Sequence, residues 1–303
     1  MNRDGSGARQ VSRESRVARV FEAERPAWID NETVVYVSQD NSDEFDLYLV
    51  RPDGTELRRL TNNDVDEHDP VWSPDGRRIA FTRAVPMFTP PSGVRPAIYV
   101  MRADGSGVKR LTRTSDGWSP AWSPDGRRIA FVGIWHHAAA LFVMNADGSG
   151  VHRVPKTALG GTEFTAVDWS KDGTRLVFTA HAGTGETQLF SIPVRGGAPR
   201  QLTDNNSYYV TAPRWAPDGR AIAFITHTYC GRNCEVASLV SRARTGVHHG
   251  LVRRATGAGW SPDGRALAFS DNRIGIVSAD GKSRRYITSP SPNVDVGPNW
   301  TSR

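Results

Sequence analysis

Two histidines occupy matching places in two copies of a repeated phrase. His181 and His227 each lie three residues beyond a phenylalanine, Phe178 and Phe224 respectively. Imidazole nitrogen is a common ligand of zinc and of other divalent metals. Histidines on neighbouring units of a repeat could share one metal ion, which would polarise a substrate carbonyl or activate water.

Further ligands for such a metal would come from other loops, and the candidates are Glu163, His68, Asp69 and His136. The ordinary interpretation competes with this hypothesis, because loop histidines commonly only hydrogen-bond and repeats place equivalent residues alike by descent. No HxH or HExxH spacing occurs in the sequence,. The sequence therefore predicts no cofactor, with a divalent metal held by His181, His227, His68 and Asp69 as the alternative. A histidine acting as a general base without metal is a third hypothesis.

Aromatic residues occur in the same variable stretches as these histidines. Trp118 and Trp135 are the two of nine tryptophans that fall outside a repeated position, and Tyr208 and Tyr209 adjoin each other. Such side chains either anchor a sugar or peptide or fill gaps between loops. The predicted binding residues are Trp118, Trp135, His136, Tyr208, Tyr209 and Glu163.

One variable stretch is strongly acidic. Asp64, Asp66, Glu67 and Asp69 lie within six residues of one another and could bind Ca²⁺,. The prediction favours a solvated loop instead, because charge clusters are usually exposed to water.

The elements that must position these residues are set by an internal repeat. WSPDGRRIAF stands at 72–81 and again at 122–131, with close variants at 169–178, 215–224 and 260–269. A repeat of 40 to 50 residues is typical of propellers and solenoids,. The period is marked by tryptophans, namely Trp28, Trp72, Trp122, Trp169, Trp215, Trp260 and Trp300.

Each unit reads as four short strands. The first strand ends at the tryptophan, an Asp-Gly turn follows, and an apolar second strand such as RRIAF comes next,. A variable stretch, a third strand, a second Gly-containing turn and a fourth strand complete the unit. The prediction is an all-β fold, a six-bladed β-propeller of four-stranded antiparallel blades.

Strand alternation sorts the connections of such a blade onto two ends of the ring. Turns after strands one and three, which carry Asp-Gly, lie at one end, and the varied loops after strands two and four lie at the other. We call these the Asp-Gly end and the varied-loop end. Function concentrates on varied loops, so the varied-loop end is the predicted binding end. Arginines of the DGRR turns at 75–78 and 125–128 fall at the Asp-Gly end, where simple solvation is predicted.

WSPDG followed by an apolar triplet, IYVM, ADGS and RLT resembles the TolB-type propeller repeat, also called PD40 or WD40-like. The resemblance covers about residues 25–303 and implies a single propeller domain, preceded by an extension at 1–24 that could add a closing strand, as could the segment at Trp300. Only the short extension at 1–24 precedes the propeller repeat, so we do not expect the α/β domain that precedes the propeller in TolB. The resemblance implies a protein-binding platform. Propellers with this repeat also accompany serine peptidases and form sugar-acid lyases. The sequence contains no GxSxG motif, which is the nucleophile motif expected of a serine peptidase of this kind,.

Composition narrows the partners. The net charge is +6, and 34 of 38 basic residues are arginines scattered beside Asp-Gly turns, so nucleic-acid binding is not predicted,. No apolar run reaches the length of a membrane span,. We expect a monomer that binds a protein or peptide without catalysis; the alternative is a metal-assisted lyase or hydrolase acting on a sugar or small metabolite.

The compartment has two interpretations. The N-terminus has no signal-peptide pattern, which favours the cytoplasm,. The family resemblance favours a periplasmic or other extracytoplasmic site. A disulfide between Cys230 and Cys234 would also favour such a site, although two reduced thiols fit the sequence equally well,.

Overall fold

The architecture was analysed in a computed structural model. The structure describes residues 27–28, 34–39, 45–50, 56, 58–87, 93–112, 117–136, 138–155, 166–181, 187–203, 208–229, 235–243, 248–253, 257–260, 263–270 and 274–286. The extension at 1–24, both cysteines, Glu163 and Trp300 lie outside these ranges. Among the described residues, no helix could span a membrane.

The described strands form six sheets, and each sheet contains four consecutive antiparallel strands. We call them blades 1 to 6. Blade 1 comprises β1 (Ala27–Trp28), β2 (Val34–Gln39), β3 (Phe45–Val50) and β4 (Arg58–Arg59). Blade 2 comprises β5 (Glu67–Trp72), β6 (Arg78–Met87), β7 (Gly93–Arg102) and β8 (Lys109–Arg110). Blade 3 comprises β9 (Gly117–Trp122), β10 (Arg128–Trp135), β11 (Ala138–Asn145) and β12 (His152–Arg153).

Blades 4 to 6 repeat the same order. Blade 4 comprises β13 (Val167–Trp169), β14 (Arg175–His181), β15 (Thr187–Pro193) and β16 (Arg200–Gln201). Blade 5 comprises β17 (Tyr208–Trp215), β18 (Ala221–Tyr229), β19 (Glu235–Ala243) and β20 (His248–Arg253). Blade 6 comprises β21 (Gly257–Trp260), β22 (Ala266–Ser270), β23 (Ile274–Ser278) and β24 (Arg284–Tyr286). The chain is thus an all-β propeller of antiparallel blades, as the sequence predicts.

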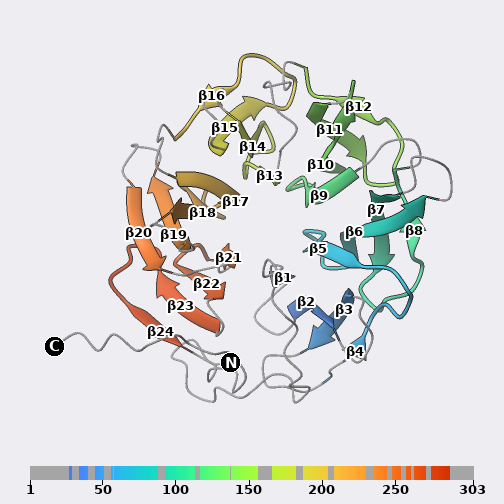
Figure 1. Ribbon diagram of the computed structural model, residues 1–303, viewed down its shortest axis with the longest axis horizontal. Helices are drawn as coiled ribbons and strands as arrows, with labels where there is room; N and C mark the ends of the chain where they lie inside the picture. Colours follow the sequence, from blue (N-terminus) through green and yellow to red (C-terminus); the bar gives the residue numbers. More distant parts are fainter. Residues whose placement is uncertain are drawn as a thin grey trace.

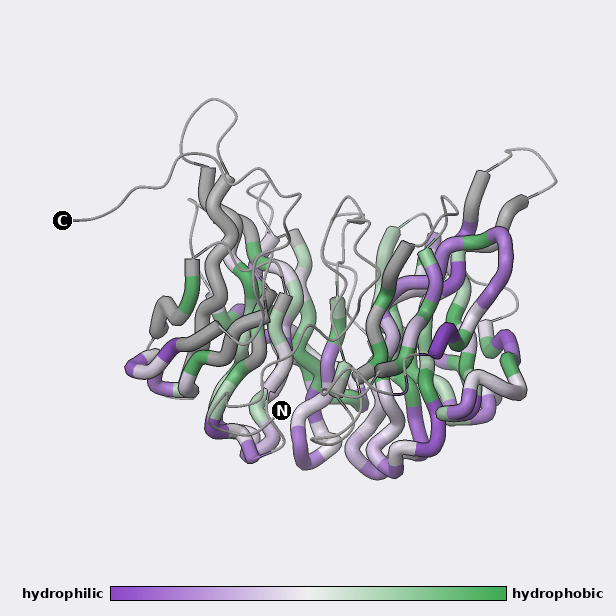
Figure 2. The backbone as a smooth tube through the Cα atoms, turned by 90° about the horizontal axis from the view of Figure 1, so that it is seen from below, coloured by the Kyte–Doolittle hydropathy of each residue, from purple (hydrophilic) through white to green (hydrophobic). Residues whose placement is uncertain are grey.

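The blades stand around a common axis, with the first strand of each blade innermost and the fourth outermost (Figure 1). A cavity of about 250 Å³ is lined by inner-strand residues of all six blades, including Ala27, Trp72, Asp168 and Arg214. Seen from the side, hydrophilic tight turns follow the lower rim of the ring, which is the Asp-Gly end (Figure 2). The axis and the two ends therefore follow directly from strand alternation.

The core is built from the second strands, whose apolar runs are buried on both faces. In blades 2 to 6, one phenylalanine per blade occupies the same place in the repeat and is at most 2% exposed, namely Phe81, Phe131, Phe178, Phe224 and Phe269. Three of these rings stack on an aromatic ring of the neighbouring third strand, at centroid distances of 5.4 to 5.8 Å. The repeated IAF and LVF triplets are therefore core residues.

The Asp-Gly turn is held by its own side chains. In blade 2, the Asp75 Oδ1 atom accepts hydrogen bonds from the Ser73 hydroxyl at 2.6 Å and from the Arg77 amide at 3.1 Å. These bonds, the Ser73 bond first, hold the pKa of Asp75 below its usual value,. Gly76 follows with a φ of 67°, a conformation that costs other residues free energy,.

In four blades, the repeated tryptophan joins the blade to the one before it. The Trp122 Nε1 atom donates to the Val71 carbonyl at 3.2 Å, and the Trp169 Nε1 atom donates to the Ala121 carbonyl at 3.0 Å. Trp72 and Trp260 make the same bond to the preceding blade. The phrase WSPDG is therefore structural, with one part forming a turn and another joining blades.

Three inner strands carry a bulge at the same repeat position. Asp69, Ser119 and Ala212 each precede a proline, each has a φ between 50° and 56°, and each lies where the pairing with the second strand shifts register. A bulge bends the strand and redirects the side chains beside it. It therefore sets how His68 and Trp118, the residues just before two of these bulges, are presented near the varied-loop end.

Two turn glycines provide a test of this packing. Gly173 and Gly196 both have positive φ values, of 67° and 87°. A Cβ atom at Gly173 would meet only Pro124 at 3.8 Å, whereas one at Gly196 would lie 2.7 to 3.0 Å from the Pro155 ring in the neighbouring blade. We expect Gly173→Ala to lower the free energy of unfolding by about 1 kcal/mol and Gly196→Ala to lower it further by overpacking. Urea unfolding of both variants measures this, and equal losses would contradict the steric argument.

Candidate functional site

The varied-loop end contains the predicted site residues that the structure describes. His68 and Asp69 lie in β5, Trp118 lies in β9, and Tyr208 and Tyr209 begin β17. All of these are inner strands, which run from the varied-loop end toward the Asp-Gly end. Trp135 ends the second strand β10, and His136 follows it.

Trp135 is an exposed aromatic member of this set. Its side chain is 44% exposed, at the tip of the β10–β11 hairpin. The Trp135 ring meets the His136 ring edge-on, with centroids 4.7 Å apart, and the Arg153 guanidinium lies 5.1 Å from the Trp135 ring centre. An exposed tryptophan held beside an arginine is the composition of an interface anchor.

Trp118 has a different environment. It is partly buried and packs against a core cluster that includes Val132, Leu141, Val167 and Phe178, from blades 3 and 4. Of the two interpretations of the aromatic set, filling a gap between blades therefore describes Trp118, and anchoring describes Trp135.

The two paired histidine positions lie in second strands of neighbouring blades. His181 is the last residue of β14, and His227 lies in β18. In the backbone register, His227 stands opposite Tyr209, so the strand pairing places one predicted metal ligand beside one predicted binding residue,. The side chains of both histidines and all of Glu163 lie outside the described parts of the structure, so the metal site stays a prediction.

Among side chains that the structure describes, no group of three His, Cys, Asp or Glu residues has the arrangement of a metal site. His68 is near the Phe45 ring, with centroids 6.0 Å apart at a tilt of 43°. Asp69 adopts the positive φ of the bulge described above. These two residues lie in blade 2, away from the blades that carry His181 and His227.

The acidic stretch is solvated only in part, which corrects the expectation from sequence for Glu67; Asp64 is exposed, and Asp66 and Asp69 are half-buried. Glu67 is fully buried. Its Oε1 atom accepts from Arg83 Nε at 2.7 Å and from Asn63 Nδ2 at 2.9 Å, and its Oε2 atom accepts from the Thr61 hydroxyl at 2.8 Å. Burial raises the pKa of Glu67, and these hydrogen bonds and the Arg83 charge oppose that rise,.

The network around Glu67 joins blades 1 and 2 at the varied-loop end. The Thr61 hydroxyl also lies 3.1 Å from Asp46 Oδ1, and Asp46, itself fully buried, is paired with Arg59. On the other side, the Arg83 guanidinium lies over the Tyr99 ring at 4.8 Å. The charged members of this network form two ion pairs, Glu67 with Arg83 and Asp46 with Arg59. Paired polar groups in a buried network rigidify their surroundings, so these pairs stiffen the rim on which His68 is placed.

The sequence contains no signal for this network, because a buried glutamate and a solvated one look alike in a sequence.

The prediction that the arginines of the DGRR turns are simply solvated also needs correction in part. Arg77 and Arg127 are exposed, as expected, but Arg78 lies 4.6 Å from the Trp122 ring centre and Arg128 lies 4.9 Å from the Trp169 ring centre. The second arginine of each DGRR turn therefore covers the tryptophan of the next blade.

Sequence comparison identifies related proteins. The family model described as "TolB beta propeller domain" (PD40) matches residues 114–302. The Tol-Pal system protein TolB of Nitratidesulfovibrio vulgaris is 40% identical over 50 residues, which is 16% of this chain and 11% of that protein. The matched segment is thus a small part of that relative.

Solved structures share the fold at low identity. TolB from Acinetobacter baumannii superposes with a TM-score of 0.67 at 22% identity, over 84% of this chain and 62% of that one. An oligogalacturonate lyase in complex with manganese superposes with a TM-score of 0.62 at 10% identity, over 86% of this chain and 75% of that one. At these identities, the likeness concerns the fold alone.

Proposed function

Because the chain belongs to the TolB β-propeller domain family, we propose that it is a six-bladed, non-catalytic binding propeller whose varied-loop end engages a protein or peptide. The six sheets and the axial cavity lined by all of them support a complete ring. The observation that carries the binding end is Trp135, exposed at a hairpin tip between His136 and Arg153.

Leaving the apolar ring of Trp135 exposed to water costs free energy. Covering an exposed tryptophan face with a partner removes apolar surface from water, and the Arg153 guanidinium can pair with a carboxylate or carbonyl of the same partner. Both groups are already held against each other, so little side-chain freedom is lost on binding. The buried network around Glu67 stiffens the same end of the ring in blades 1 and 2.

A matched pair of variants tests this proposal. Trp135→Ala removes the anchor at the varied-loop end, and Val151→Ala removes an equally exposed apolar residue, 45% against 44%, at the Asp-Gly end. In affinity capture from bacterial extract, we expect the wild type and Val151→Ala to retain the same partner protein. The affinity of that partner for Trp135→Ala should be about tenfold lower. Equal retention by all three proteins would contradict the proposed face.

A metal-assisted lyase or hydrolase is the second candidate function. It is favoured by the equivalent second-strand positions of His181 and His227 on neighbouring blades. The manganese-bound lyase of the same fold gives this candidate an analogy and no more. Glu163 and His136 would complete the ligand set, and the metal would polarise the bond to be cleaved.

Metal analysis separates the two candidates. The lyase hypothesis expects about one equivalent of metal per chain and a higher melting temperature in its presence, both lost in His181→Ala/His227→Ala. The binding hypothesis expects the melting temperature of that double variant to be insensitive to added Mn²⁺ or Zn²⁺ and partner capture to be unchanged. Metal uptake that survives the double substitution would contradict this site.

A further inference from the structure

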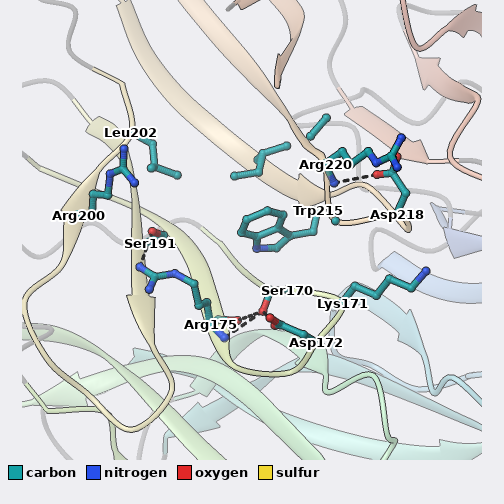
Figure 3. Close-up of a pocket in the computed structure, with 13 residues that line it drawn as sticks. Ser170, Lys171, Asp172, Arg175, Ser191, Arg200, Leu202, Trp215, Asp218 and Arg220 are labelled. Carbon is teal, nitrogen blue, oxygen red and sulfur yellow. Dashed lines mark hydrogen bonds and ion pairs between the residues drawn. The ribbon is translucent and has the colours of Figure 1, made fainter. Parts of the chain in front are cut away.

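The junction between blades 4 and 5 differs from the junctions before it. A cleft of about 880 Å³ opens there at the Asp-Gly end, between the turn at 170–172, the turn at 218–220 and the outer strand β16. Figure 3 shows the Trp215 indole in this cleft, with Arg175 and Ser191 on one side and Asp218 and Arg220 on the other. This cleft lies at the opposite end of the ring from Trp135.

Two contacts of the repeat are missing at this junction. Trp122 and Trp169 are each covered by an arginine of the preceding blade, but the equivalent Arg175 donates to the Ser191 hydroxyl at 2.9 Å instead. The Trp215 Nε1 atom is buried without a hydrogen-bond partner, and the Trp215 backbone amide donates to the Asp168 carboxylate at 2.8 Å.

Two sequence changes accompany the missing contacts. In the β14–β15 and β15–β16 registers, Ser191 takes the place that Val100 and Val143 occupy in blades 2 and 3. Lys171 stands where the other clear repeats have proline, as in Pro124. A hydroxyl at Ser191 gives the Arg175 guanidinium a partner that valine would not, so Trp215 keeps one face uncovered.

The cleft is cationic. Its lining carries four basic side chains, Lys171, Arg175, Arg200 and Arg220, and two acidic ones. Both acids are occupied by their own turns: Asp172 accepts from Ser170 and Thr174, and Asp218 accepts from the Arg220 amide and lies 4.0 Å from its guanidinium. Within the part of the chain that the structure describes, Lys171 and Arg200 have no ion-pair partner.

We propose that this cleft, lined by Trp215, Arg200, Lys171 and Arg220, is a second binding site that takes an acidic peptide segment carrying an apolar side chain. The apolar side chain covers Trp215 and the neighbouring Leu202 and Ile222, and the carboxylates pair with the basic groups at the rim,. The outer strand β16 is a sheet edge, whose free backbone groups suit an extended peptide,.

The blade 2–3 junction supplies a matched control. Arg200 corresponds in the repeat to Lys109, and Arg220 corresponds to Arg127, so Arg200→Glu/Arg220→Glu and Lys109→Glu/Arg127→Glu change the charge equally at equivalent surface places. Only the first pair adjoins the open cleft, because Arg78 covers Trp122 at the control junction. Ser191→Val is the third variant, since it should release Arg175 to cover Trp215.

The test uses the full chain and fluorescence anisotropy of a fluorescein-labelled peptide, Gly-Glu-Asp-Leu-Phe-Glu-Asp-Gly. We expect binding at least about tenfold tighter than for the same peptide with Gln and Asn in place of the acids. Arg200→Glu/Arg220→Glu should weaken binding about tenfold, and Ser191→Val should weaken it about fivefold without lowering the melting temperature. The control pair and Trp135→Ala should stay within roughly twofold of wild type.

Equal weakening by the two charge-reversal pairs would overturn the proposal, because binding would then follow net charge alone. So would an acidic peptide that does not bind, or one displaced by an equal concentration of inorganic phosphate, which would assign the site to a small anion. Trp135 lies at the opposite end of the ring from this cleft. A negative peptide-binding result therefore does not bear on the partner face around Trp135, and a negative result for Trp135→Ala does not bear on this cleft.

Discussion

Trp169→Ala is expected to lower the free energy of unfolding by about 4 kcal/mol. The Trp169 ring is 4% exposed, lies under the Arg128 guanidinium, and donates its Nε1 hydrogen to the Ala121 carbonyl of the preceding blade at 3.0 Å. The substitution removes the ring, leaves a cavity between blades 3 and 4, and deprives a buried carbonyl of its donor. Urea unfolding followed by tryptophan fluorescence and circular dichroism measures the loss.

Phenylalanine variants isolate the hydrogen bond between blades. Trp169→Phe keeps most of the ring but loses the bond, so it should cost about 1 to 2 kcal/mol. Trp215→Phe removes an Nε1 donor that has no partner, so its effect should be about zero or slightly stabilising,. Equal losses for the two variants would mean that the blade 4–5 junction is joined like the others, contrary to its open cleft.

Glu67→Ala is expected to lower the free energy of unfolding by about 3 kcal/mol. Glu67 is fully buried, and removing its carboxyl group leaves the Arg83 guanidinium, 18% exposed, without its acidic partner and the Asn63 amide without its acceptor. The double variant Glu67→Leu/Arg83→Met should lose less stability than the sum of the losses in Glu67→Leu and in Arg83→Met, because an apolar pair leaves no charge buried. An additive result would contradict the network.

The stability contributed by Glu67 should depend on pH in a defined direction. Its pKa is raised above 4.5 by burial, so between 4.5 and the folded-state pKa the folded protein holds a proton that the unfolded chain releases,. Stability from this group is therefore present below pH 4.5 and is lost as the pH rises through the folded-state value.

The matched variant for this dependence is Glu67→Gln, which cannot ionise. The difference in unfolding free energy between wild type and Glu67→Gln should fall from pH 4.5 to pH 7.5. The turn aspartates, whose pKa values are lowered, have the opposite dependence but are common to both proteins and cancel. A difference that rises with pH would contradict the burial argument.

The family assignment does not carry the function of any relative across to this chain. The TolB of N. vulgaris matches over 11% of its length, and a manganese-bound lyase shares the same propeller. A propeller presents two ends and several blade junctions, and each can be altered without changing the sheets. For this reason, both binding proposals rest on particular side chains, Trp135 at one end and Trp215 at the other.

The sequence by itself determined the sheets, because strand-forming residues and Asp-Gly turns act locally. The period of the tryptophans, the apolar second strands and the Asp-Gly turns, whose glycines have positive φ in blades 2 to 6, predicted antiparallel four-stranded blades and the two ends of the ring. It also placed Trp135 at the varied-loop end, since strand order alone decides on which end a connection lies.

Only the tertiary structure decided which polar residues are buried and which blade junction is open. Glu67 and Arg83 are brought together because β6 returns beside β5. Arg175 donates a hydrogen bond to Ser191 and does not cover Trp215. Such pairings depend on register and on the neighbouring blade, so a local pattern does not contain them. Lys171 and Ser191 were visible as departures from the repeat, but their consequence needed the packing of two blades.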